Sequence, residues 1–304
     1  MKYICAQPAS IYYAWQVEVM LYNFKRRGID LNDVHIVCAA DEAPNEWVKL
    51  RDGYEANFYF YPDRRRTKQY ISSIRPNILK QHFAAYPELK NETIFYHDCD
   101  MIFSHVMNTA QFEGNDVWYG SDTNSYINYD YIISKGQDIF DKMVEIVGID
   151  PQLVIDNNKN SIGAQYILKG IDEAFWHDVQ IDSENLFIEI SAMNDQKKRD
   201  NPEYHELQIW CADMWALLWN GWKRGHVTRC HDDLQFSWAT SSEDSYYKYN
   251  IFHNAGVTSS QDDLFYKSIY ISSPPYNLGL QMKEGRASKK YYEWIQRVEK
   301  ETVL

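Results

Sequence analysis

The sequence predicts an α/β fold with a mostly parallel, twisted sheet flanked by helices. Over the first hundred residues, strand-like and helix-like segments alternate, which is typical of such a sheet. An apolar run at residues 93–96 leads directly into Asp98 and Asp100 and resumes as residues 101–103, so an acidic pair follows a buried strand. At 304 residues the chain is long enough to bury a core without disulfide bonds.

The individual elements follow from local patterns. A helix over residues 11–27 is expected to end at Gly28, and Pro76 fits the first turn of the next helix. We expect strands at residues 3–6, 34–39, 56–61, 117–122 and 162–168, helices at 11–27, 76–86, 137–147 and 204–220, and an exposed loop at 193–202.

Asp98 and Asp100 are the strongest candidates for a functional site. Side chains alternate along a strand, so the two carboxylates share a face if the strand continues through them, while Cys99 faces away and packs. Their mutual repulsion is costly unless a divalent cation or a basic group neutralises it. In open α/β sheets, ligands bind at the carboxyl ends of the strands, where we also expect the loop after the first strand.

Composition narrows the range of functions. A net charge of −12 disfavours a broad duplex-DNA-binding surface, and an aromatic content of 15% suits pockets that stack on sugars or bases. Five scattered cysteines without a C-x-x-C pair indicate a reducing compartment. The start of the chain leaves no room for a signal peptide, and no apolar stretch approaches the roughly 20 residues that span a bilayer, so we predict a cytoplasmic protein.

Several enzyme classes lack their sequence signatures here. The chain contains neither a G-x-x-x-x-G-K-[ST] loop nor a G-x-G-x-x-G turn, which argues against P-loop, kinase and dinucleotide-binding functions. It also lacks a G-x-S-x-G elbow and a cysteine with a credible histidine partner, so nucleophilic hydrolase chemistry is unsupported.

Asp213 is the candidate for acid–base chemistry. It lies in an apolar, tryptophan-rich segment, where a carboxylate needs a partner or a catalytic task. As a general base it would take the proton of an acceptor hydroxyl. The alternatives are a salt bridge to Lys or Arg and a solvent-facing position, and Glu206 and Asp122 are competing carboxylates.

Four motifs in order resemble the glycosyltransferases of the GT-A fold. The Asp98-Cys99-Asp100 turn is similar to their D-x-D motif, and residues 251–256 around His253 resemble their late H-x-x-G segment. Residues 161–166 resemble the G-G-x-Q-type strand, and residues 210–215 resemble the start of the helix that carries an acidic residue. The order is most similar to the branch of peptidyl hydroxyproline and serine glycosyltransferases with its phage and bacterial relatives. The K-P-W ending of the wider families is absent.

The resemblance implies a single GT-A-like catalytic domain over residues 1–304, with a nucleotide-sugar-binding half at 1–122 and an acceptor-side half at 123–304. It implies Mn²⁺ or Mg²⁺ held by two carboxylates and an imidazole, a set that favours Mn²⁺. The implied metal ligands are Asp98, Asp100 and His253, the implied catalytic residues are Asp213 and Gln165, and the implied donor-binding residues are Ala6, Gln7, Pro8, Arg75, Asp98, Gly163, Ala164 and Lys267.

The expected reaction moves a hexose or pentose from a nucleotide diphosphate sugar, a UDP-sugar above all, to a hydroxyl acceptor. Lys267 would contact a phosphate oxygen as a point charge, although it also fits a solvated surface lysine. Arg75 suits a phosphate or the acidic pair, but is equally typical of a surface helix start.

Two other function classes stay open. A nucleotidyltransferase would use a similar acidic pair, but residues 6–10 lack its glycine-rich, basic loop. A non-catalytic sugar- or protein-binding module would keep the fold alone. The acceptor is expected to be a small molecule, a peptide, a glycan or a modified nucleobase, and the stereochemical course is not readable from the chain.

Overall fold

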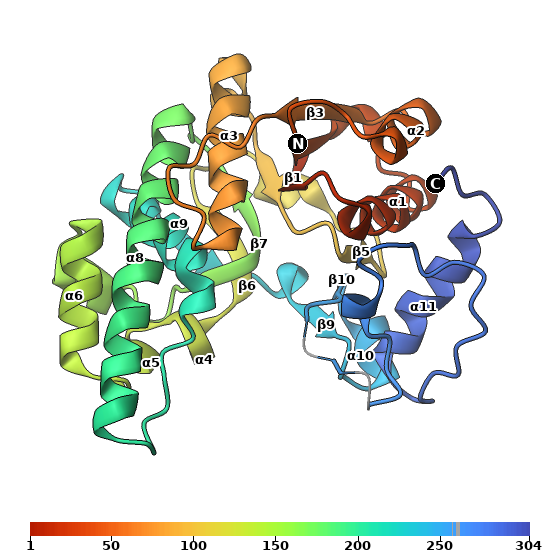
Figure 1. Ribbon diagram of the computed structural model, residues 1–304. Coiled ribbons are helices and arrows are strands. Elements are labelled where there is room, and N and C mark those ends of the chain that lie inside the picture. Colours follow the sequence, from red (N-terminus) through yellow and green to blue (C-terminus); the bar gives the residue numbers. More distant parts are fainter. Residues whose placement is uncertain (257, 260–261) are drawn as a thin grey trace. The chain divides into compact units, whose positions relative to one another are not determined.

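The computed structural model describes residues 1–256, 258–259 and 262–304 and divides into two compact units (Figure 1). The first unit contains residues 1–62, 94–113 and 232–304, and the second contains residues 63–93 and 114–231. Because the chain passes between them several times, each unit combines segments that lie far apart in the sequence. The single catalytic domain with its two halves stays a prediction.

Parallel strands build the main sheet of the first unit. Its order is β3-β2-β1-β4, and all three strand pairs are parallel. A small second sheet has the order β5-β10-β9, in which β10 is antiparallel to β5 and parallel to β9. The strands are β1 (Lys2–Pro8), β2 (Val34–Ala39), β3 (Asn57–Tyr61), β4 (Ile94–Tyr96), β5 (Met101–Phe103), β9 (Phe236–Trp238) and β10 (Ile251–His253).

The helices of the first unit bury their apolar sides against these strands and one another. Helix α1 packs against α2, α11 and β5, and eleven consecutive residues of α1, 14–24, are buried. The helices are α1 (Ile11–Arg26), α2 (Asn45–Gly53), α10 (Glu243–Lys248) and α11 (Ala287–Val298).

The second unit has three strands and a layer of helices. Strand β6 (Trp118–Asp122) lies between β7 (Ile162–Leu168), its antiparallel partner, and β8 (Thr228–Cys230), its parallel partner. Helix α8 packs against α3, α6 and α9 (Figure 1). The helices are α3 (Ile74–Ala85), α4 (Asn124–Ile127), α5 (Tyr129–Ile133), α6 (Gln137–Val147), α7 (Pro151–Asp156), α8 (Glu173–Asp200) and α9 (Ala212–Lys223).

The predicted α/β class and the mostly parallel strand pairing are confirmed. Strands β2 and β7 and helix α6 have the predicted bounds, and Gly148 ends α6 in a left-handed conformation with φ at 65°. Helix α3 begins two residues before Pro76, which therefore occupies its third position.

Two element predictions were wrong. Residues 193–200 are helical, because they form the last turns of α8, and the basic residues 197–199 lie where cations favour a helix C-terminus. The aromatic helix predicted at residues 204–220 begins only at Ala212, after a 3-10 turn at Ile209–Cys211. Among the described residues, no helix has both the length and the hydrophobicity needed to cross a membrane.

The packing of α8 on α9 contains a carboxyl group with a testable pH dependence. Asn220 Nδ2 donates to Asp182 Oδ2 at 2.7 Å, and burial raises the pKa of Asp182 to about 6. Because this pKa exceeds the unfolded value, the favourable contribution to folding is present below about pH 4 and is lost as pH rises through about 6.

Asp182→Asn should therefore raise the free energy of unfolding by about 1–2 kcal/mol near pH 7.5 and change it little near pH 4. Urea unfolding at both pH values measures this difference. Asp178→Asn is the matched control, because Asp178 is 45% exposed and pairs with Arg224. A gain of equal size at both pH values would contradict the assignment.

Candidate metal and diphosphate site

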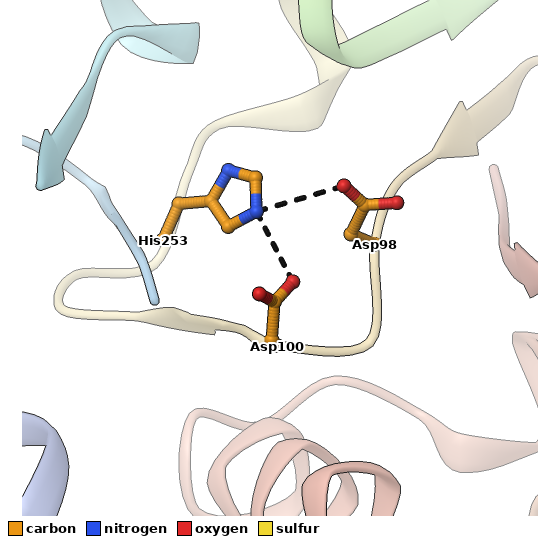
Figure 2. A group of neighbouring side chains, drawn as sticks. All are labelled: Asp98, Asp100 and His253. Atoms are coloured by element: carbon orange, nitrogen blue, oxygen red, sulfur yellow. Dashed lines mark hydrogen bonds and ion pairs between the residues drawn. The ribbon is translucent and has the colours of Figure 1, made fainter. Parts of the chain in front are cut away.

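The turn between β4 and β5 carries the acidic pair. Strand β4 ends at Tyr96 and β5 begins at Met101, so Asp98 and Asp100 lie in a turn rather than within one strand. The strand therefore does not continue through the pair, and the alternation of side chains along a strand does not set their directions. Both carboxylates nevertheless point toward His253 (Figure 2).

His253 reaches the pair because β10 runs beside β5, with His253 opposite Met101. Its Nε2 lies 3.1 Å from Asp100 Oδ1 and 3.6 Å from Asp98 Oδ2. The side chains of His253 and Asp100 are each 7% exposed, whereas that of Asp98 is 34% exposed. The site is therefore buried on one side and open toward Asp98.

Lys267 completes the group. It begins a short 3-10 turn at Lys267–Ile269, and its Nζ donates to Asp100 Oδ2. Burial would raise the pKa of Asp100, but Lys267 and His253 hold it well below its usual range. Burial would lower the pKa values of Lys267 and His253, yet Asp100 raises both above their usual values. The charge on Asp100 and the pKa values of His253 and Lys267 thus depend on one another.

The donor set fits a divalent cation. One ligand atom from each of Asp98, Asp100 and His253 lies within 4.8 Å of the other two. Two carboxylate oxygens and one imidazole nitrogen form a mixed set of the kind that Mn²⁺ accepts. An ammonium group has no lone pair to donate, so Lys267 is not a ligand.

The residues next to the two carboxylates in the chain are buried and do not belong to the candidate ligand set. Cys99 is 5% exposed, which confirms that it packs. His97 is buried and stacks on Phe95 with ring centroids 5.1 Å apart, and burial lowers its pKa to about 4. The Trp238 ring lies nearly parallel to the His253 ring, at 14° with ring centroids 6.5 Å apart.

Ala6, Gln7 and Pro8, predicted for the donor loop, lie in strand β1 itself, because that strand extends to Pro8. Ala6 and Gln7 are buried, and Pro8 is half-buried. Gln7 Nε2 lies 3.2 Å from Val37 O and 3.4 Å from Cys38 Sγ. The Gln7 side chain therefore contacts the neighbouring strand β2, and the loop that follows the strand begins only after Pro8.

The second unit brings Arg75 and Asp213 together. Arg75 Nη2 donates to Asp213 Oδ2 at 2.5 Å, and Tyr70 Oη donates to Asp213 Oδ1 at 2.5 Å. The side chains of Arg75 and Asp213 are 24% and 12% exposed. This arrangement is the salt bridge that was the alternative to a general base. The competing carboxylates Asp122 and Glu206 are exposed.

Strand β7 is irregular at the predicted donor-sugar segment. The β6–β7 register shifts between Gly120 and Ser121, and Ala164 has a left-handed φ of 61°, which is uncommon for a residue with a side chain. Gln165 is fully buried, and its Oε1 accepts a hydrogen bond from Ser121 Oγ at 2.8 Å. At Gly163 a Cβ would lie 2.4 Å from Met214 Cε, so only glycine fits without movement.

Sequence reasoning missed three contributors. Tyr70 binds Asp213 from 143 residues away, and no local pattern marks it. Ser121 positions Gln165, and Trp238 flanks His253. The one sequence signal for any of these three residues was the strand predicted at residues 117–122, which ends next to Ser121.

Comparison with solved structures identifies the fold. No known protein family and no curated protein matches the sequence. An active-site mutant of LgtC, with a glutamine changed to glutamate, superposes with a TM-score of 0.50 at 10% identity, covering 97% of this chain and 95% of LgtC. The chain has a GT-A-type fold. The predicted fold class is thereby confirmed.

Two further GT-A-type structures are more distant. The bifunctional glycosyltransferase WbbM matches 99% of this chain at 9% identity with a TM-score of 0.49, and this chain spans 50% of its length. The glycosyltransferase GlyE of Streptococcus pneumoniae TIGR4 matches 97% of this chain at 13% identity with a TM-score of 0.43, and this chain spans 61% of its length.

Proposed function

We propose that the protein is a metal-dependent glycosyltransferase that moves a sugar from a nucleotide diphosphate sugar, with UDP-sugars as the first choice, to a hydroxyl acceptor. One observation carries the proposal: Asp98, Asp100 and His253 form a cation-ligand set with Lys267 against it, in a chain with a GT-A-type fold. LgtC has also been crystallised with donor and acceptor sugar analogues.

The proposed reaction breaks the bond between the anomeric carbon and a phosphate oxygen and forms a bond to the acceptor oxygen, whose proton passes to a base. A divalent cation would neutralise the charge that develops on the diphosphate. Asp98, Asp100 and His253 would hold that cation, and Lys267 would contact a phosphate oxygen. Mn²⁺ is the proposed ion.

Asp213 and Gln165 stay proposals as catalytic residues. A base needs an accessible lone pair, and both Asp213 oxygens accept hydrogen bonds, from Arg75 and Tyr70. Because each carboxylate oxygen has two lone pairs, Asp213 would act as the base through a lone pair that these two bonds leave. Gln165 would reach a donor sugar only after leaving Ser121. Arg75, Gly163 and Ala164 stay proposals as donor-binding residues, with Arg75 as a contact of a phosphate group.

The acceptor and the cellular setting are also proposals. We propose a small molecule, a peptide, a glycan or a modified nucleobase as the acceptor, within the branch that the motifs resemble. Four of the five free cysteines are buried, which suits a reducing cytoplasm.

The decisive experiment incubates the protein with a panel of UDP- and GDP-sugars and Mn²⁺ and measures the release of nucleoside diphosphate. We expect slow hydrolysis of at least one UDP-sugar and its loss when EDTA removes the metal. If no nucleotide sugar is hydrolysed and none raises the melting temperature, the proposal is wrong.

A further inference from the structure

Asp100 is shared between two partners, the imidazole of His253 and the ammonium group of Lys267. Its Oδ1 lies against His253 Nε2, and its Oδ2 accepts from Lys267 Nζ. The Lys267 side chain is 13% exposed and that of Asp100 is 7% exposed, so solvent screens this ion pair only weakly. A cation that takes an oxygen of Asp100 must therefore displace one of these contacts or weaken it by charge repulsion.

We infer that Lys267 couples the binding of the cation to the binding of the diphosphate. When no diphosphate is bound, Lys267 lowers the affinity of the site for the cation. When a diphosphate gives the ammonium group another partner, Lys267 instead assists binding of the cation. The inference rests on the proposed function, because it assumes the same metal and diphosphate ligands. It assigns to Lys267 a role in cation affinity in addition to the proposed phosphate contact.

The surroundings of Lys267 favour movement of its side chain over movement of the backbone. Three residues along the chain, Tyr270 O accepts a hydrogen bond from Trp15 Nε1 at 3.1 Å, and Trp15 is fully buried in α1. Phe265, two residues before Lys267, is 1% exposed and stacks on Tyr270 with ring centroids 5.5 Å apart. The segment is thus held on both sides, whereas a lysine side chain has four flexible methylene groups.

The exchange of partners accounts for the coupling. Without a diphosphate, a cation approaching Asp100 meets a buried ammonium group and the two positive charges repel each other. With a diphosphate present, the ammonium group moves from a carboxylate oxygen to a phosphate oxygen and stays paired. By thermodynamic linkage, if the diphosphate raises the affinity for the cation by some factor, the cation raises the affinity for the diphosphate by the same factor.

The test measures Mn²⁺ affinity by isothermal titration calorimetry without any nucleotide, for the wild type and for Lys267→Met. Lys267→Met is expected to bind Mn²⁺ about tenfold more tightly, because the competing ammonium group is gone. In a metal-free buffer with EDTA, the same variant should show a smaller thermal shift with UDP than the wild type does.

Lys289→Met is the matched control, since it removes the same charge from a lysine that pairs with the 80%-exposed Glu284. It should bind Mn²⁺ like the wild type. Lys267→Gln serves as a second neutral variant, and thermal melts establish that both variants are folded.

Three results of these binding measurements would overturn the inference. Equal Mn²⁺ affinity in the wild type and in both Lys267 variants overturns the inference and leaves the proposed function in place. Equal tightening in the Lys289→Met control also overturns it, because the effect would then follow from net charge. If Mn²⁺ binds none of the proteins, with or without UDP, the proposed metal dependence itself is wrong and the inference falls with it.

Discussion

Asp98→Asn is expected to lower sugar-nucleotide turnover about a thousandfold while leaving the melting temperature nearly unchanged. A cation ligated by a carboxylate contributes several kcal/mol of transition-state stabilisation, and about 4 kcal/mol corresponds to this factor. Asn keeps the shape of Asp but loses the charge. Because Asp98 is 34% exposed and lies 3.6 Å from His253, folding depends on it less than on Asp100.

The measurements are the initial rate of nucleoside diphosphate release at saturating Mn²⁺ and a thermal melt of the same sample. Asp52→Asn is a control for the loss of one surface carboxylate, since Asp52 is 66% exposed. Turnover within a factor of three of the wild type would show that Asp98 does not hold a catalytic cation. Asp100→Asn is less clean, because it also leaves the buried Lys267 ammonium without its carboxylate.

Glu18→Ala is expected to cost about 4 kcal/mol of unfolding free energy and to release the C-terminal residues. Glu18 is fully buried in the middle of α1, and its carboxylate accepts hydrogen bonds from Tyr276 Oη at 2.6 Å, Val303 N at 2.7 Å and Thr302 Oγ1 at 3.0 Å. A hydrogen bond to a charged group contributes about 1.5–3 kcal/mol, so the loss of three such bonds to half-buried donors accounts for about 4 kcal/mol. Burial also raises the pKa of Glu18.

Urea unfolding measures the stability change, and the rate of carboxypeptidase digestion reports on the C-terminus. Glu301→Ala is the matched control, because its ion pair with Arg26 has both side chains more than half exposed and should contribute under about 1 kcal/mol. Glu18→Gln keeps one acceptor oxygen and should cost less than Glu18→Ala. Equal stability of the Glu18→Ala and Glu301→Ala variants would contradict the proposed role of Glu18.

Local sequence patterns predicted the regular elements best. Strand β2 and helix α6 appeared with the predicted bounds, because β-branched residues and helical apolar spacing act within a few residues of each other. The last turns of α8 were assigned to a loop because seven of their eight residues, 193–200, are polar or charged, and the helical state of α8 depends on packing against α3, α6 and α9.

The candidate site likewise combines residues that a local sequence pattern predicts with contacts that only the fold creates. Asp98 and Asp100 were found from their place after an apolar strand, which is a local signal. The contact of His253 with Asp100 joins residues 153 positions apart, and that of Lys267 joins residues 167 positions apart. Sequence resemblance suggested both residues, but only the folded chain shows that they share one carboxylate.

The pairing of Arg75 with Asp213 depends on tertiary structure alone. The sequence allowed Arg75 to face a phosphate, the acidic pair or solvent, and allowed Asp213 to be a base or an ion-pair partner. The fold pairs them across 138 residues. Residue types and local order thus sufficed for the α/β class, β2, α6 and the acidic turn. The partner of each buried charge was decided by the fold, because Coulomb and hydrogen-bond energies depend on distance in space and not on separation along the chain.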